Sequence, residues 1–373
     1  MQCIKTIVFV VNVDWFFVSH RLPLAEEALS RGWRVFLIAK DTGKFGQLER
    51  LGLKCIPLHI DRSSKNFLKE FLLIRALKNI YNKIQPDIVH HVTLKPCIYG
   101  TIALRNFKGV KIINAISGLG YSFTDNRNSW SKSILVRLLK FAFKRKSSKF
   151  IFQNPDDLAF YAHLKFVTTD NSTIIKGSGV DENVFNYTQP ESKAKVIVTL
   201  LCRMLKDKGV QEFIEAAKLL KKGSQNQLQF MLVGGIDVEN PAHITKNELE
   251  SMCDGEYLSW KGSSSDVMSV YSQSDIVCLP SYREGLPKSL VEAMAIGRPV
   301  ITTDAVGCRE CVDHGVNGFL VPVKDHIKLS EKILLLASDE QLRIKMGKKS
   351  REKMVNEMCL SLVVRQTFEF YEK

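Results

Sequence analysis

Two carboxylates, Glu284 and Glu292, stand eight residues apart in the second half of the chain. A short apolar run, Ile276 to Leu279, precedes the first and predicts a strand, and a helical pattern that begins at Leu290 contains the second. This order of strand, loop and helix puts both carboxylates near the carboxyl end of a parallel strand, where open α/β sheets bind ligands. The free N–H groups at the start of the helix suit a diphosphate just beyond Gly285. Taken singly, Glu292 is also explained as a first-turn helix residue and Glu284 as a solvated loop residue.

The flanks of these carboxylates make the pattern more specific. Pro280-Ser281 precedes Glu284, and Gly297-Arg298-Pro299-Val300 follows Glu292. The whole block resembles the E-x7-E signature of the retaining glycosyltransferases of family four, which have the GT-B fold. The resemblance extends over essentially the whole chain, with its specific motifs concentrated in residues 196 to 322.

The resemblance implies a role for several residues of the second half. Arg203 and Lys208 would grip the diphosphate of a nucleotide-sugar donor, and the charge of a departing nucleoside diphosphate does need such cations. A solvated basic turn is the alternative for these two. The remaining implied contacts are Gly234 at a turn close to the nucleotide, Lys261 beside the base, Gly285 and Leu286 in the loop, Glu292 on the ribose hydroxyls and Glu284 on the donor sugar. No Asp-x-Asp occurs in the sequence, so we expect no metal site and no cofactor besides the UDP-sugar substrate.

Two histidines, His90 and His91, are the candidates for catalysis in the first half. They lie in Asp87-Ile88-Val89-His90-His91, at the end of a predicted strand, and resemble the Pro-Asp-x-x-His segment of the family. A hydrogen-bonded structural role is the alternative for each. After the next strand the family often has a histidine, whereas this chain has Ser117-Gly118-Leu119-Gly120, so the group that faces the donor sugar from this half stays open.

Length and patterning predict two domains. A chain of 373 residues exceeds one ordinary core, and apolar runs alternate with amphipathic stretches in both halves, as in parallel doubly wound sheets. The turn Asn12 to Phe17 after the first strand has no glycine, which argues against a dinucleotide site there. We therefore predict an α/β protein of GT-B fold with a cleft between two Rossmann-like domains, 1–187 on the acceptor side and 188–355 for the nucleotide sugar. The resemblance implies that a last helix, 356–373, returns to the first domain.

Composition narrows the class of protein. With 45% hydrophobic and 25% charged residues, and no apolar run of the 18 or so residues that span a bilayer, we expect a cytoplasmic globular protein. The nine cysteines are scattered and read as reduced. Cys308 and Cys311 form the only C-x-x-C, and without a second pair a metal or redox role is the minor alternative.

The net charge of +14 is confined to the first half. Residues 1–190 hold 28 Lys and Arg against 14 Asp and Glu, whereas residues 191–373 hold 25 against 25. One domain therefore faces an anionic partner. The stretch Trp130 to Lys146 combines an apolar face with Arg137, Lys140 and Lys144. Together with the charge asymmetry it suggests binding to an anionic membrane surface, and a core helix with a solvated basic stripe is the alternative. Nucleic acid is disfavoured because no reading motif accompanies the basic residues.

A narrower resemblance suggests the reaction. It joins segments in both halves: Phe16 to Pro23, Leu94 to Pro96, Ser117 to Gly120 and Pro280 to Pro287. They look like bacterial enzymes that add a hexose or N-acetylhexosamine from a UDP-sugar to an undecaprenyl-diphosphate-linked saccharide in cell-surface polysaccharide synthesis. The hypothesis is thus a retaining, metal-independent glycosyltransferase, peripheral on the inner face of the cell membrane. The alternative is a non-catalytic or regulatory protein that binds nucleotide sugars.

Overall fold

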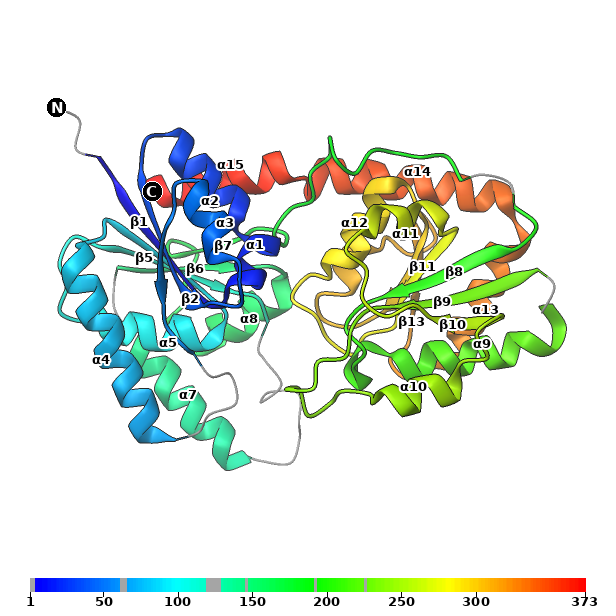
Figure 1. Ribbon diagram of the computed structural model, residues 1–373, viewed down its shortest axis with the longest axis horizontal. Coiled ribbons are helices and arrows are strands. Elements are labelled where there is room, and N and C mark those ends of the chain that lie inside the picture. Colours follow the sequence, from blue (N-terminus) through cyan, green and yellow to red (C-terminus); the bar gives the residue numbers. More distant parts are fainter. Residues whose placement is uncertain (1–3, 61–65, 119–128, 145–146, 191–192, 225–226) are drawn as a thin grey trace. The chain divides into compact units, whose positions relative to one another are not determined.

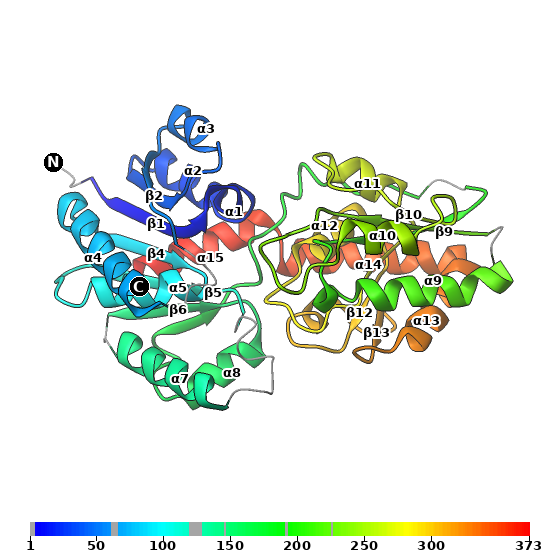
Figure 2. The same cartoon turned by 60° about the horizontal axis from the view of Figure 1, so that its bottom comes forward.

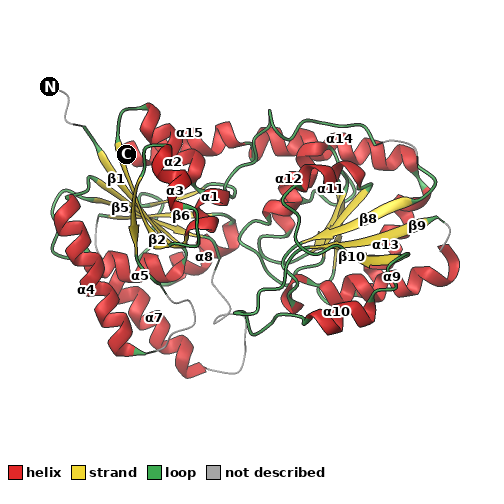
Figure 3. Ribbon diagram, viewed as in Figure 1, coloured by secondary structure: helices red, strands yellow, loops and turns green. Residues whose placement is uncertain are grey.

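The structure is a computed structural model that describes residues 4–60, 66–118, 129–144, 147–190, 193–224 and 227–373. The chain divides into two compact units, Met1–Ser178 with Val363–Lys373, and Gly179–Leu362. In each unit a sheet lies at the centre, with helices on its faces (Figures 1 and 3). The division after Ser178 precedes the predicted boundary at residue 187. Among the described helices, none combines the length and the apolar character needed to cross a membrane.

The first unit is built on a parallel sheet in the order β3-β2-β1-β4-β5-β6-β7. The strands are β1 (Thr6–Val13), β2 (Arg34–Lys40), β3 (Lys54–Pro57), β4 (Ile88–Val92), β5 (Lys111–Ile116), β6 (Ser148–Phe152) and β7 (Ser172–Ile174). Every residue of β1 and β4 is buried, as expected of strands covered on both faces. The order of the strands reverses between β1 and β4, which are neighbours in the sheet.

Helices cover the sheet of the first unit. They are α1 (Asp14–His20), α2 (Leu22–Ser30), α3 (Phe45–Arg50), α4 (Phe67–Ile84), α5 (Leu94–Ala103), α7 (Ser129–Phe143), α8 (Pro155–His163) and most of α15 (Leu360–Glu372). The side chains of Val363, Phe368 and Tyr371 from α15 are buried in the same core cluster as Phe9 of β1. The end of the chain thus completes the core of the unit that holds its beginning.

The second unit repeats the plan with the order β10-β9-β8-β11-β12-β13, again with parallel neighbours. Its strands are β8 (Val196–Leu201), β9 (Leu228–Val233), β10 (Leu258–Trp260), β11 (Ile276–Leu279), β12 (Val300–Thr303) and β13 (Gly318–Val321). Its helices are η1 (Lys206–Lys208), α9 (Val210–Ser224), α10 (Lys246–Met252), α11 (Val267–Gln273), α12 (Lys288–Ile296), η2 (Arg309–Cys311), α13 (His326–Ser338) and α14 (Glu340–Glu357). The predicted alternation of strands and helices is confirmed in both units.

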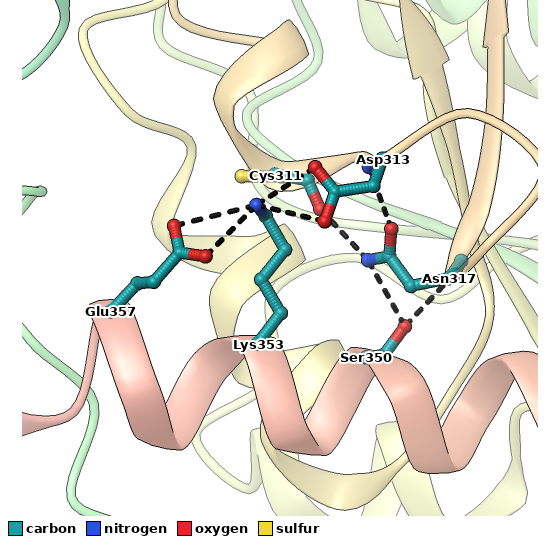
Figure 4. A network of polar contacts seen from close by, with 6 residues as sticks. All are labelled: Cys311, Asp313, Asn317, Ser350, Lys353 and Glu357. Atoms are coloured by element: carbon teal, nitrogen blue, oxygen red, sulfur yellow. Dashed lines mark hydrogen bonds and ion pairs between the residues drawn. The ribbon is translucent and has the colours of Figure 1, made fainter.

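A polar network holds α14 against the segment between η2 and β13 (Figure 4). Lys353 lies 3.0 Å from Asp313 and 3.2 Å from Glu357, and its side chain is only 11% exposed. One turn away, Asn317 donates to the backbone oxygen of Cys311 at 2.9 Å, and Ser350 donates to the backbone oxygen of Asn317 at 3.0 Å. These contacts fix α14, which packs against α12 and so supports the helix that bears Glu292.

Two segments of the first unit differ from the expected pattern. The segment Asn12 to Phe17, expected as a turn, contains the end of β1 and the first residues of α1. The strand β4 runs on through Val92, so His90 and His91 lie inside the sheet, opposite Phe9 and Val10 of β1, rather than at its end. Both differences arise because the strands extend further along the chain than predicted, β1 to Val13 and β4 to Val92.

Candidate functional site

The two site segments of the second unit meet where its strand order reverses. Strands β8 and β11 are neighbours, and from β8 the chain turns to β9 on one side, whereas β11 continues toward β12 on the other. Lys208 follows β8 and Glu284 follows β11. Lys208 Nζ lies 2.5 Å from Glu284 Oε1, and the two side chains are only 16% and 13% exposed. A lysine and a carboxylate therefore meet at the place where doubly wound sheets bind ligands.

Backbone contacts hold the two segments together. The N–H of Tyr282 and the hydroxyl of Ser281 both donate to the backbone oxygen of Asp207, at 2.9 and 3.1 Å. A Cβ on Gly209 would lie 2.1 Å from the backbone oxygen of Pro280, and Gly209 has a φ of +74°, so only glycine allows this approach. The lysine segment is thereby fixed against the loop that carries Glu284.

A tyrosine anchors the same loop from the other side. Tyr282 donates its hydroxyl to Oε1 of Glu212, a residue in the first turn of α9, at 2.6 Å. In the same loop, the N–H of Glu284 donates to the backbone oxygen of Val306 at 2.9 Å. No sequence pattern points to Glu212, because it is 70 residues from Tyr282 and only the fold brings the two side chains together. Tyr282, in contrast, lies inside the Pro280 to Pro287 motif, so the sequence alone could have suggested it as a site residue.

Lys208 stays protonated in this environment. Burial acts to lower its pKa, but the charge and hydrogen bond of Glu284 outweigh burial, so the net pKa is raised above the ordinary lysine value. The cation is thus preserved in a partly buried site, as the binding of an anionic ligand requires. The charges of Lys208 and Glu284 compensate each other in this pair.

Glu292 lies on α12 and is nearly fully buried, with 8% of its surface exposed. Tyr271 donates its hydroxyl to Glu292 Oε2 at 3.1 Å and to the backbone oxygen of Ser289 at 2.8 Å, and Lys288 Nζ lies 3.5 Å from Glu292 Oε1. Burial raises the pKa of Glu292, and Lys288 and Tyr271 offset this only in part. Burying a charged carboxylate destabilises the fold, and a carboxylate kept buried with a raised pKa is typical of a functional site.

This pKa gives a testable expectation for stability. Because the folded-state pKa of Glu292 is raised, the protonated form is favoured in the fold, and stability declines as the pH rises from the unfolded pKa through the folded one. Glu292→Gln removes this titration and still accepts from Tyr271. We expect its melting temperature to exceed that of the parent at pH 8, with the difference shrinking toward pH 4, in differential scanning fluorimetry. Glu250→Gln, at a side chain that is 56% exposed, is the control. A difference independent of pH would contradict the expectation.

The other predicted residues of this unit follow the carboxyl ends of β8, β9, β10 and β11. Arg203 pairs with Asp237 at 2.5 Å, a partner that the sequence did not suggest, and its side chain is 43% exposed. Gly234 donates its N–H to the backbone oxygen of Gly262 at 2.7 Å and accepts from the Trp260 indole at 3.0 Å. Lys261, Gly285 and Leu286 occupy the loops after β10 and β11, with Lys261 exposed and the other two half-buried.

The two histidines of β4 have different environments. His91 is fully buried, with Nδ1 at 3.0 Å from Asn114 Oδ1, which can only accept, and Nε2 at 3.0 Å from the Tyr81 hydroxyl. Burial lowers its pKa to about 4, partly offset by Asn114. Because both ring nitrogens are engaged, we interpret His91 as a structural residue of the sheet rather than a catalytic group.

His90 retains a free ring nitrogen. Its Nδ1 is hydrogen-bonded to the Tyr371 hydroxyl of α15, and its Nε2 is buried without a partner among the described residues. Burial, then the nearby Arg21 and His91, hold its pKa well below the ordinary histidine value, so the ring is neutral. Of the two histidines, His90 is the one with a ring nitrogen that no described residue engages.

Within the described residues, no group of three or more His, Cys, Asp or Glu side chains is arranged to hold a metal ion. Cys308 and Cys311 are reduced and buried, and burial raises the pKa of Cys308 to about 12. Cys308 therefore stays a neutral thiol that packs under the site loop, where its Sγ lies 3.7 Å from the backbone oxygen of Ser281.

Comparison with known proteins identifies the family. Residues 182–353 match the model for "Glycosyl transferases group 1", and residues 6–154 match "Glycosyl transferase 4-like". The chain is 31% identical to N,N'-diacetylbacillosaminyl-diphospho-undecaprenol alpha-1,3-N-acetylgalactosaminyltransferase of Campylobacter jejuni, over 90% of this chain and 92% of that protein. This chain belongs to the glycosyltransferases. The family resemblance read from the sequence is thereby confirmed, and the protein is an enzyme of that class.

Two further relatives extend the comparison. The chain is 24% identical to UDP-Gal:alpha-D-GlcNAc-diphosphoundecaprenol alpha-1,3-galactosyltransferase of Escherichia coli, over 78% of this chain and 76% of that protein. The structure of Anabaena Alr3699/HepE in complex with UDP and glucose superposes with a TM-score of 0.80, at 16% identity over 98% of this chain and 99% of that one. The predicted GT-B fold of this glycosyltransferase is confirmed.

Proposed function

We propose that this glycosyltransferase moves a hexose or N-acetylhexosamine from a UDP-sugar to a saccharide carried on a lipid diphosphate, with retention of configuration and without a metal. The observation that supports it most is the Lys208–Glu284 pair at the strand-order reversal of the second unit. Relatives whose names specify diphospho-undecaprenol acceptors, and in one case a UDP-galactose donor, support the choice of substrates.

The residues of the site divide the work of binding the donor. Lys208 and Arg203 bind the diphosphate, with the N-terminus of α12 adding N–H donors beyond Gly285. Glu292, held by Tyr271, binds the ribose hydroxyls, and Glu284 binds hydroxyls of the donor sugar once the diphosphate has taken its place on Lys208. The loops at Gly234 and Lys261 line the nucleotide.

The chemistry then follows from charge balance. The bond between the anomeric carbon and UDP breaks, the acceptor hydroxyl oxygen bonds to that carbon, and the hydroxyl proton is released. The departing UDP gains negative charge, which fixed cations stabilise more strongly in a partly buried site than in water. Lys208 supplies such a cation without a divalent ion.

Two measurements test this reaction. We expect UDP release from a panel of UDP-sugars and a lipid-diphosphate-linked acceptor to continue at an undiminished rate in EDTA, because Lys208 does the work of a metal. Proton NMR of the early product should show the anomeric configuration of the donor. Loss of activity in EDTA that magnesium or manganese restores, or an inverted anomer, would overturn the proposal. Binding of UDP-sugar without UDP release would favour a non-catalytic protein.

We also propose that the enzyme works at the inner face of the cell membrane, bound to an anionic surface through its first unit. All of the excess positive charge of the chain belongs to residues 1–190, and Arg137 and Lys140 of α7 and Lys144 directly after it are exposed. An anionic leaflet contributes about 1 kcal/mol for each nearby Lys or Arg, so a few such residues suffice for reversible binding. A lipid-linked acceptor requires the enzyme to work at such a surface.

A further inference from the structure

The strongest unexplained feature of the first unit is an apolar patch at the start of α4. Phe67, Leu68, Phe71 and Leu72, here called the α4 patch, are 83%, 67%, 61% and 53% exposed. Their spacing of one, four and five residues puts them on one side of the first two helical turns. Single exposed apolar residues are ordinary, but adjacent large ones mark an interaction surface.

The helix beneath the α4 patch is well fixed. Asn66 caps it by accepting from the N–H groups of Leu68 and Lys69, at 3.0 and 3.4 Å. Further along, Leu77 and Tyr81 are fully buried against the sheet. The exposure of the patch is therefore not due to a loose helix, and Figures 1 and 2 show α4 at the periphery of the first unit.

The charges of α4 select the partner. Its exposed charged residues are all basic: Lys69, Arg75, Lys78 and Lys83. Its one acidic residue, Glu70, is turned toward α5 and pairs with Lys95 at 2.8 Å, with 13% of its side chain exposed. A second copy of this basic face would repel the first, whereas a surface that offers both negative charge and an apolar interior matches both properties.

We propose that the α4 patch inserts into the headgroup region of a bilayer that contains anionic phospholipid, with Lys69, Arg75 and Lys78 on the lipid phosphates. This inference rests on the proposed action on a lipid-linked acceptor and names the part of the enzyme that enters the membrane. Insertion of the α4 patch differs from attraction by the exposed basic residues of α7 in its dependence on salt. Binding through buried apolar surface persists at high salt concentration, whereas binding through charge attraction is weakened by salt.

The salt dependence of vesicle binding separates the two contributions. We expect the protein to cosediment with phosphatidylglycerol–phosphatidylcholine vesicles at 0.05 M NaCl and to stay partly bound at 0.5 M NaCl. Phe67→Ser with Phe71→Ser should lower the partition coefficient about tenfold or more at either salt concentration, given the apolar surface that two phenyl rings bury. The α7 triple variant, with Arg137, Lys140 and Lys144 changed to Glu, should lose binding mainly at 0.05 M.

Matched variants in the second unit serve as controls. Leu219 and Leu334 are 49% and 42% exposed on α9 and α13, so Leu219→Ser with Leu334→Ser removes two partly exposed apolar side chains elsewhere and should leave vesicle binding unchanged. For depth, tryptophan fluorescence of Phe71→Trp should be quenched by brominated lipids above the background of the four native tryptophans, whereas Leu219→Trp should add no quenching.

Two outcomes would overturn the proposal. One is equal vesicle binding by the double Phe variant and the parent. The other is an oligomer in lipid-free solution that the double Phe variant converts to monomers, which would assign the α4 patch to contacts between copies. Turnover distinguishes this inference from the proposed function, since the double Phe variant should match the parent on a water-soluble acceptor and lose rate only on a vesicle-embedded one. If no UDP-sugar supports turnover but the vesicle results hold, the proposed reaction fails and the membrane contact stands.

Discussion

Lys208→Met is expected to lower kcat/KM for the UDP-sugar by about ten- to hundredfold, because a hydrogen bond to a charged group contributes roughly 1.5–3 kcal/mol. The side chain lies 2.5 Å from Glu284, with 16% of its surface exposed, so water replaces its charge poorly. Glu284→Gln should lower kcat/KM by a similar factor, because the proposed role of Glu284 is to bind hydroxyls of the donor sugar. Steady-state UDP release gives both values.

The double variant sharpens the test. If the two residues act as one unit, Lys208→Met with Glu284→Gln should lose less than the product of the two single losses, since each single change already breaks the pair. The control is Lys221→Met, which breaks an ion pair of 2.6 Å between Lys221 and Asp254 whose side chains are 40% and 36% exposed. This change should leave turnover intact. A Lys208→Met enzyme with full turnover would remove Lys208 from the site.

The sequence predicted the part of this site that local patterns determine. The stretch from Asp275 to Gly297 contains strand, loop and helix in the order that the structure shows, and the apolar run and helical period suffice to place Glu284 and Glu292. The contact between Lys208 and Glu284 was not foreseen, because it depends on β8 and β11 being neighbours, and spacing along the chain does not reveal strand order.

The same limit explains the histidines. His91 reads as a candidate catalytic residue until its partners Tyr81 and Asn114 are known, and these come from α4 and β5. His90 is hydrogen-bonded to Tyr371, which is 281 residues away.

Arg298 illustrates a motif residue whose work is structural. It belongs to the Gly297-Arg298-Pro299 block that supported the family resemblance, yet only 1% of it is exposed. Its guanidinium donates to the backbone oxygens of Thr188 at 2.6 Å, Tyr271 at 3.1 Å and Ile296 at 3.3 Å, and to the Thr188 hydroxyl at 3.0 Å. It joins the segment before β8 to α11 and α12.

We expect Arg298→Met to lower the free energy of unfolding by about 3–5 kcal/mol, in the range measured when one partner of a buried charged contact is removed. The loss arises because several buried carbonyl oxygens are left without donors, each at a cost of about 1–3 kcal/mol before relaxation. Urea denaturation measures the change. Arg298→Lys keeps the charge but lacks the planar set of donors, so it should fall between the parent and Arg298→Met, and it keeps the test open if Arg298→Met does not fold.

The effect should also reach the proposed donor site, because Arg298 donates to the backbone oxygen of Tyr271 and Tyr271 donates to Glu292. Arg298→Lys is therefore expected to weaken UDP-sugar binding more than a partly exposed control of the same type, Arg309→Lys, whose partner is Asp304 at 2.7 Å. Arg309→Lys alters only a surface ion pair, so it should lower the free energy of unfolding by less than about 1 kcal/mol. If Arg298→Lys matches the parent in both stability and donor affinity, Tyr271 and Glu292 hold their positions without the guanidinium.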